Sequence, residues 1–219
     1  MLGDEMPDLD AELVQEVCGI IDVNCFEYRI STAAGSRESL RVLYGQTSML
    51  NHSCVPNAQI RIDTNQTVVV RAQTEIRKGE SICISYIDPL HTTLFRRNFL
   101  EHGKYFICKC NRCSDPCEQG TLLSAVACLS CRNGPVVPQA KSGKLQWICT
   151  GCNFEMPDEA VARMEEVLQN IVKNIQNMPV DSSLIERCED LLVTLSRKLH
   201  PTHALLMEVK IHLYALRSR

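Results

Sequence analysis

Two pairs of cysteines carry the clearest chemical signal in this sequence. Cys128 and Cys131 form one CxxC pair, and Cys149 and Cys152 form a second pair about 17 residues later. Each tight turn of this kind presents two thiolates, and four thiolates close a tetrahedron around zinc. The spacing therefore predicts a structural zinc site whose four positions are all filled by protein sulfur.

A second group of cysteines supplies three metal ligands. The segment CKCNRC contains Cys108, Cys110 and Cys113, whereas a tetrahedral structural zinc needs four ligands. Cys117 is a local candidate for the fourth position, and its choice gives the simpler chain path. Cys54 is a distant candidate, and its choice would explain why a cysteine lies in the stretch SMLNHSCVPNA, residues 48–58. The residues alone leave both candidates open.

The composition indicates a globular chain with metal-binding thiols. The chain has 219 residues, of which 45% are hydrophobic and 22% charged, so it can bury a sizeable core. With no apolar run near the roughly 20 residues that span a bilayer, and an acidic N-terminus in place of a signal peptide, we expect an intracellular protein without a membrane segment. In a reducing compartment the 13 cysteines favour metal binding over disulfides. The formal net charge of −3 gives no reason to expect direct nucleic-acid binding.

The first half of the chain predicts mostly strands. Residues 18–30 are apolar and β-branched, which indicates extended structure, and residues 57–73 alternate like a hairpin turning at DTNQ. A tight turn at Gly79 precedes the alternating segment SICISYID. A short helix, TTLFRRNFLEHG, follows and is predicted to end at Gly103, with RRNFLEHGK as its solvated face.

The second half changes from strands to helices. Between the two CxxC pairs, the residues VVPQAKSGKLQWIC predict two strands joined by an Ala-Lys-Ser-Gly turn. Three helices are then predicted, opening at Pro157 and Asp158, at about Ser183, and after the segment HPTH. Their apolar stripes indicate packing faces, and three antiparallel helices of this length resemble the start of a helical-hairpin array.

Three motifs in a fixed order give the chain a family resemblance. The segments NHSCVPNA, IRKGESICISYID and FRRNFLEHGKYFICKCNRC, followed by LHPTHALLMEVKIHLYAL, resemble the SET- and MYND-domain lysine methyltransferases, closest to arthropod members with an added CxxC ribbon. The resemblance implies an α+β fold. Residues 1–103 would form part of a SET domain and residues 104–118 a post-SET zinc segment. Residues 119–157 would form the zinc ribbon and residues 158–219 a C-terminal helical, TPR-like region.

The resemblance also implies a site. In such proteins Asn51 and His52 lie against S-adenosylmethionine, Phe106 packs beside this cofactor, and Tyr86 is the catalytic tyrosine that orients the substrate lysine. It further implies that Cys54 is the fourth ligand of the first zinc. The expected cofactors are S-adenosylmethionine and two structural zinc ions, whose ligands would be Cys54, Cys108, Cys110 and Cys113 at one ion and Cys128, Cys131, Cys149 and Cys152 at the other.

Two departures from the family pattern keep two functions open. The sequence contains no GxG segment of the kind that approaches the cofactor in the family, and no MYND finger. We therefore expect an N-terminally truncated form or a short isoform. One hypothesis is a protein-lysine N-methyltransferase, and the other is a non-catalytic, zinc-stabilised interaction module. Its partner would be a protein, bound through a lysine-bearing segment or by the C-terminal helices, in the nucleus or cytoplasm.

Overall fold

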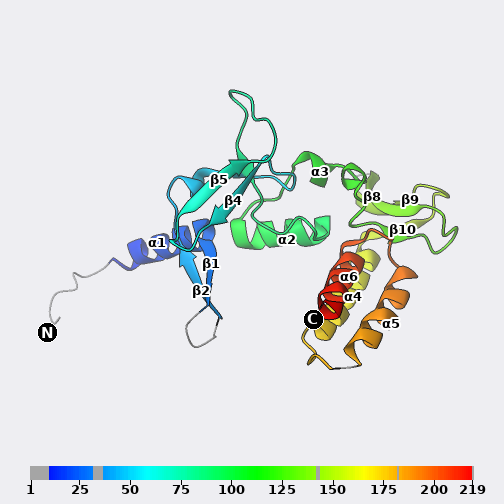
Figure 1. Cartoon of the computed structure of the whole chain (residues 1–219). Helices are drawn as coiled ribbons and strands as arrows, with labels where there is room; N and C mark the ends of the chain where they lie inside the picture. Colours follow the sequence, from blue (N-terminus) through cyan, green and yellow to red (C-terminus); the bar gives the residue numbers. More distant parts are fainter. Residues whose placement is uncertain (1–9, 32–36, 142–143, 182, 219) are drawn as a thin grey trace. The chain divides into compact units, whose positions relative to one another are not determined.

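The computed structural model describes residues 10–31, 37–141, 144–181 and 183–218. The chain divides into two compact units, Met1–Tyr86 and Ile87–Arg219 (Figure 1). Helices and strands occur in both units, which confirms the predicted α+β class. Among the described residues, no helix is long and apolar enough to cross a membrane.

The first unit consists of short paired strands beside one longer helix. Its elements are α1 (Ala11–Asn24), β1 (Phe26–Ser31), β2 (Arg37–Val42), η1 (Thr47–Met49), β3 (Asn51–His52), β4 (Ala58–Ile62), β5 (Val68–Ala72) and β6 (Cys83–Ile84). The pairs β1–β2 and β4–β5 are antiparallel, whereas β3 and β6 run parallel. The hairpin predicted for residues 57–73 is therefore confirmed, with β4 and β5 as its strands. Within the alternating segment SICISYID only Cys83–Ile84 forms a strand, so the strand is shorter than the alternation indicates.

The prediction of extended structure for residues 18–30 is wrong in its first half. Helix α1 runs to Asn24, and only Phe26 onward is strand. The Asp10 side chain caps this helix by accepting the Glu12 backbone N–H at 3.0 Å. Apolar side chains recur at helical spacing on it, and this period prevails over the β-branched composition; they are Leu13, Val14, Val17, Ile20 and Ile21.

The second unit holds the cysteine-rich segments and the long helices. Its elements are α2 (Thr93–Lys104), α3 (Asn111–Ser114), η2 (Glu118–Gly120), β7 (Val126–Ala127), β8 (Pro135–Lys141), β9 (Lys144–Cys149), β10 (Glu155–Pro157), α4 (Asp158–Gln176), α5 (Leu184–Ser196) and α6 (Ala204–Arg217). The three predicted C-terminal helices are confirmed. Strands β7 to β10 form one antiparallel sheet in the order β10-β9-β8-β7. Ser142 and Gly143 of the predicted turn between β8 and β9 lie outside the described residues.

Helix α2 differs from its prediction in two ways. It continues past Gly103 to Lys104, and the left-handed residue that ends it is Tyr105, with φ of 59°. Its arginines do not both lie on a solvated face, because Arg96 is 0% exposed. A buried guanidinium needs charged or polar partners, so α2 contributes polar contacts to the interior of this unit.

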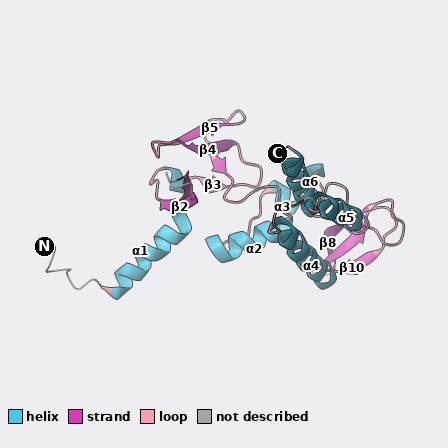
Figure 2. Cartoon of the chain, turned by 60° about the horizontal axis from the view of Figure 1, so that its bottom comes forward, coloured by secondary structure: helices cyan, strands magenta, loops and turns pink. Residues whose placement is uncertain are grey.

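The sheet and the three C-terminal helices share one hydrophobic core. Strands β8 and β10 lie beside the helices in Figure 2, and α4 contacts β9 and β10 directly. Trp147 of β9 donates its indole N–H to Asp158 Oδ1 at 2.8 Å and so holds the start of α4. The buried members of this core are Val126, Cys128, Val136, Trp147, Cys149, Val161, Leu168, Val172, Leu184, Cys188, Leu191, Leu195, Leu199, Leu205, Leu206, Val209 and Leu213.

One buried carboxyl group makes the stability of this unit depend on pH. Burial raises the pKa of Glu165 from 4.5 to about 7, although the Thr92 hydroxyl donates to it. The folded state then holds this proton while the unfolded state has lost it, so stability falls as pH rises from about 4.5 to 7. Each pKa unit corresponds to about 1.4 kcal/mol.

We therefore expect Glu165→Gln to raise the free energy of unfolding by about 3 kcal/mol at pH 7 and by about 1 kcal/mol at pH 5. The glutamine carbonyl can still accept the Thr92 hydroxyl. Urea titration at the two pH values measures the difference, with the exposed Glu166→Gln as the matched control. A gain in the free energy of unfolding that did not grow with pH would contradict the raised pKa of Glu165.

Candidate functional site

Three of the sequence-predicted site residues meet in the first unit. Asn51 and His52 form β3, which pairs with Cys83 and Ile84 of β6, and Tyr86 follows β6 by two residues. The Tyr86 hydroxyl donates to the Leu50 carbonyl, and its backbone N–H donates to His52 Nδ1 at 3.0 Å. The rings of His52 and Tyr86 lie 5.2 Å apart. Residues separated by 34 positions in the sequence are thus held in direct contact.

The two contacts of His52 fix its protonation pattern. Because a backbone N–H can only donate, Nδ1 of His52 must be the unprotonated nitrogen of a neutral ring. Nε2 then carries the hydrogen, and it lies 3.3 Å from Cys54 Sγ. His52 therefore connects the tyrosine to the cysteine of the same turn.

Asn57 is a positioning residue that the sequence reasoning missed. Its side-chain amide donates to the Ser81 carbonyl at 2.9 Å, and its side-chain oxygen accepts the Cys83 N–H at 2.8 Å. These bonds align the segment that leads to Tyr86 beside the turn. An asparagine directly after a proline at the end of the NHSC turn was the available signal, because such side chains often bond to nearby backbone.

The hydroxyl of Tyr86 is a neutral acceptor at physiological pH. Burial, followed by the nearby Cys83, raises its pKa above the usual 10. Its proton is donated to the Leu50 carbonyl, so toward any further group the oxygen can only accept a hydrogen bond. That combination suits a group that orients an amine.

The two CxxC pairs form a compact group of four sulfurs. The sulfurs of Cys128, Cys131, Cys149 and Cys152 all lie within 4.8 Å of one another. Cys128 and Cys152 sulfurs are 3.6 Å apart, and those of Cys131 and Cys149 are 3.7 Å apart. A tetrahedral zinc with bonds of about 2.3 Å requires sulfur separations of about 3.8 Å. The group therefore fits a zinc ion.

Backbone geometry prepares these thiols for a metal. Backbone N–H groups donate to Cys128 Sγ from Cys131 at 3.4 Å and to Cys149 Sγ from Gly151 at 3.3 Å. Burial opposes ionisation of Cys128, but such N–H donors and the neighbouring thiols lower its pKa to about 6. The chain turns left-handed directly after each pair, at Arg132 with φ of 57° and at Asn153 with φ of 58°.

The chain approaches the second CxxC pair closely at Gly134. A β-carbon there would lie 2.8 Å from the Gly151 nitrogen and 3.1 Å from Cys149 Sγ, whereas one at Gly151 would make only ordinary contacts of 3.6–3.7 Å. We expect Gly134→Ala to destabilise the protein by about 1–3 kcal/mol and Gly151→Ala to change it little. Thermal unfolding and zinc content of the two variants measure this difference. Equal stability and equal zinc content in the two variants would contradict the close approach at Gly134.

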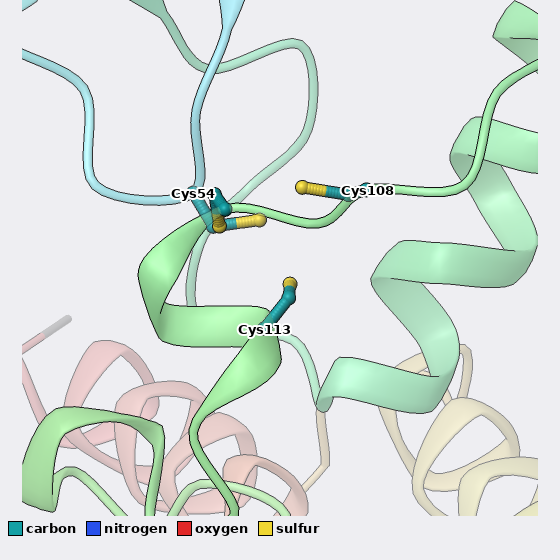
Figure 3. A group of neighbouring side chains, drawn as sticks. Cys54, Cys108 and Cys113 are labelled. Carbon is teal, nitrogen blue, oxygen red and sulfur yellow. The ribbon is translucent and has the colours of Figure 1, made fainter.

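The second group of cysteines includes Cys54 rather than Cys117. The sulfurs of Cys54, Cys108, Cys110 and Cys113 lie within 4.8 Å of one another, and in Figure 3 the side chains of Cys54, Cys108 and Cys113 point toward a common centre. Burial raises the pKa of the Cys108 thiol to about 11. A divalent cation among the four sulfurs would stabilise the thiolates against this effect, so the donor set also fits zinc.

The remaining predicted site residues are more exposed. Asn51 is exposed on β3. Phe106 belongs to the second unit, is 36% exposed, and donates its backbone N–H to the Leu100 carbonyl at 3.4 Å. The contacts of both residues with a cofactor stay predictions.

Comparison with known proteins identifies the domain. Residues 9–87 match the SET domain. The SET domain-containing protein SmydA-8, isoform B, of Drosophila melanogaster is 38% identical over 156 residues, which cover 70% of this chain and 34% of the fly protein. Histone-lysine N-methyltransferase ASHR1 of Arabidopsis thaliana is 29% identical over 144 residues, 63% of this chain and 29% of the plant protein.

A yeast protein matches a shorter part. Histone-lysine N-methyltransferase SET5 of Saccharomyces cerevisiae is 38% identical over 74 residues, 33% of this chain and 14% of the yeast protein. The predicted SET-type domain is thus confirmed, and the expected likeness to arthropod proteins agrees with the SmydA-8 match. The chain spans about a third of the length of the fly relatives that it matches.

Proposed function

We propose, from the SET domain at residues 9–87, that this chain forms part of a protein-lysine N-methyltransferase that uses S-adenosylmethionine. The observation that carries the proposal is the pair of hydrogen bonds from Tyr86 to the Leu50 carbonyl and to His52. They hold the tyrosine of the GExxxxxY segment against the NHSC turn, which is the arrangement expected of a site that aims a lysine amine. The named activities of the plant and yeast relatives support the same reaction class.

The chain's own residues would bind and orient the reactants. When bound, S-adenosylmethionine supplies a methyl group on a positively charged sulfur, which a neutral amine can attack. Tyr86 would accept a hydrogen bond from that amine and so direct the nitrogen lone pair. Because its phenol stays neutral, Tyr86 would support the developing positive charge as a dipole and would not remove the proton.

Asn51, His52 and Phe106 would form the cofactor contacts. Both ring nitrogens of His52 already have partners, in Tyr86 and Cys54. We therefore expect its backbone or ring face, rather than its ring nitrogens, to meet the cofactor. The two cysteine groups would hold zinc that stabilises the fold without taking part in the reaction, since four protein sulfurs leave no open coordination position.

We extend this proposal to the domain boundaries, the substrate and the cellular compartment. Residues 1–103 would be part of a SET domain, 104–118 a post-SET segment, 119–157 a zinc ribbon and 158–219 a TPR-like region. A protein carrying a lysine would be the substrate, in the nucleus or the cytoplasm.

Calorimetric titration of S-adenosylmethionine into the zinc-loaded chain tests the proposal. We expect micromolar binding that is lost in Asn51→Ala and kept in Tyr86→Phe, because only the first residue is assigned to the cofactor. Zinc content and circular dichroism confirm that both variants are folded. Absence of heat with the folded, zinc-loaded parent chain would overturn cofactor binding by this chain.

A second candidate is a non-catalytic, zinc-stabilised interaction module. The observation that favours it is the apolar side of α1, where Leu13, Val17 and Ile20 are 45–52% exposed. Exposed apolar surface of this kind is typical of a binding face. Failure of the calorimetric test would leave this candidate.

A further inference from the structure

A buried cluster of charges lies beside the CKCNRC segment. Arg96 on α2 is 0% exposed, Glu118 in η2 is 2% exposed, and Arg112 in α3 is 5% exposed. Arg96 Nη2 lies 3.0 Å from Glu118 Oε1, and Arg112 Nη2 lies 3.6 Å from the same oxygen. One carboxylate thus receives two guanidinium groups inside the protein.

The carboxylate of Glu118 is fully engaged and ionised. It accepts the Thr93 hydroxyl and the Ser124 backbone N–H, each at 2.6 Å. Burial opposes its ionisation, but these donors and Arg96 together hold its pKa below the usual range. Two guanidinium groups and one carboxylate leave this trio with one net positive charge in the interior. Buried charge of this kind is costly unless an anion lies nearby.

One candidate for that anion is a cysteine sulfur. Arg96 Nη2 lies 3.6 Å from Cys113 Sγ, within donor distance of the sulfur. A zinc ion held by four thiolates carries a net charge of about −2, so such a centre would complement the excess positive charge of the trio. The side chain of the adjacent residue, Arg97, donates to backbone carbonyls of the same segment. These are the carbonyls of Cys113 at 2.7 Å and of Cys108 at 3.3 Å.

We infer that Arg96, held in place by Glu118, is an outer partner of a metal–thiolate centre: it donates a charged hydrogen bond to Cys113 Sγ and so retains the metal. Removal of such outer hydrogen bonds commonly costs about 10- to 100-fold in metal affinity. The role is separate from cofactor binding. The guanidinium donor is additional to backbone N–H donors, which reach sulfurs in both cysteine groups.

The rate of zinc transfer to an excess of a chromogenic chelator tests the inference in the full, zinc-loaded chain. The two cysteine groups provide two phases, and Cys131→Ser identifies the phase that belongs to the CxxC pairs. We expect Arg96→Gln to accelerate the other phase about 10- to 100-fold and to leave the CxxC phase unchanged. Arg97→Gln is the matched control, because it removes only contacts to carbonyls and should accelerate that phase much less.

A second readout covers the case in which Arg96→Gln fails to fold. Arg96→Lys keeps the positive charge but loses the planar donor geometry. In the cadmium-substituted protein, we expect this variant to move one of two ¹¹³Cd resonances and to leave the other in place. Unchanged release kinetics in Arg96→Gln, equal acceleration of both phases, binding of a single zinc ion, or unmoved ¹¹³Cd resonances would each overturn the inference.

Discussion

Cys149→Ser is expected to remove the zinc of the CxxC pairs and to unfold the sheet formed by β7 to β10. Cys149 is 0% exposed and belongs to the core that the sheet shares with the three helices. Binding of a structural zinc by cysteines contributes apparent free energies of about 10–16 kcal/mol to small domains. Much of this free energy would be lost with one ligand, so the loss should exceed any packing effect in this unit.

The chain contains its own reporter and its own control for this experiment. Trp147, the single tryptophan, is 3% exposed and lies two residues before Cys149, so its fluorescence should shift to the red when the sheet opens. Cys188 is equally buried, in α5, but belongs to neither cysteine group. Cys188→Ser should cost only the burial of a hydroxyl, about 1–3 kcal/mol, and retain both zinc ions. A Cys149→Ser protein with full zinc content and unshifted fluorescence would contradict the zinc site.

The sequence predicts the group formed by the two CxxC pairs well because the chemistry of each pair is local. A CxxC turn places two sulfurs together whatever surrounds it, so the spacing of Cys128, Cys131, Cys149 and Cys152 leads directly to the observed group. The helices after Pro157 could be predicted equally well, since their apolar residues repeat at helical spacing over many turns. The choice of Cys54 over Cys117 could not be made from spacing, because it depends on how distant segments meet.

The errors have two causes: β-branched composition masked one helical period, and tertiary contacts decide the role of some single residues. Helix α1 was missed because β-branched residues outweighed the helical period of its apolar positions. The segment RRNFLEHGK looked solvated because arginines are usually exposed, yet Arg96 has Glu118 as a buried partner 22 positions later. Asn57 is similar, since its bonds reach Ser81 and Cys83. A local pattern can mark such a side chain as one that bonds to backbone, but it does not identify the distant partner.

Glu118→Gln is expected to lower the free energy of unfolding by about 3–5 kcal/mol, because it leaves two buried guanidinium groups without their carboxylate. The glutamine has the same shape, so the packing of η2 is retained and the loss measures charge. The effect should persist at high salt, since buried pairs are poorly screened. It should diminish at low pH. Because the pKa of Glu118 is lowered in the folded state, its carboxylate contributes stability above the usual carboxyl pKa, and this stability is lost as pH falls through the folded-state pKa.

An exposed ion pair in the same unit supplies the control. Glu189 pairs with Arg217 on the surface, with side chains 46% and 57% exposed. Glu189→Gln should therefore cost no more than about 1 kcal/mol, and even less in high salt. Urea denaturation of the zinc-loaded variants compares the two. If Glu118→Gln lost no more free energy of unfolding than Glu189→Gln, other groups would have to compensate the charge of the buried trio. The inference that Arg96 and the thiolates balance each other's charge would then be wrong.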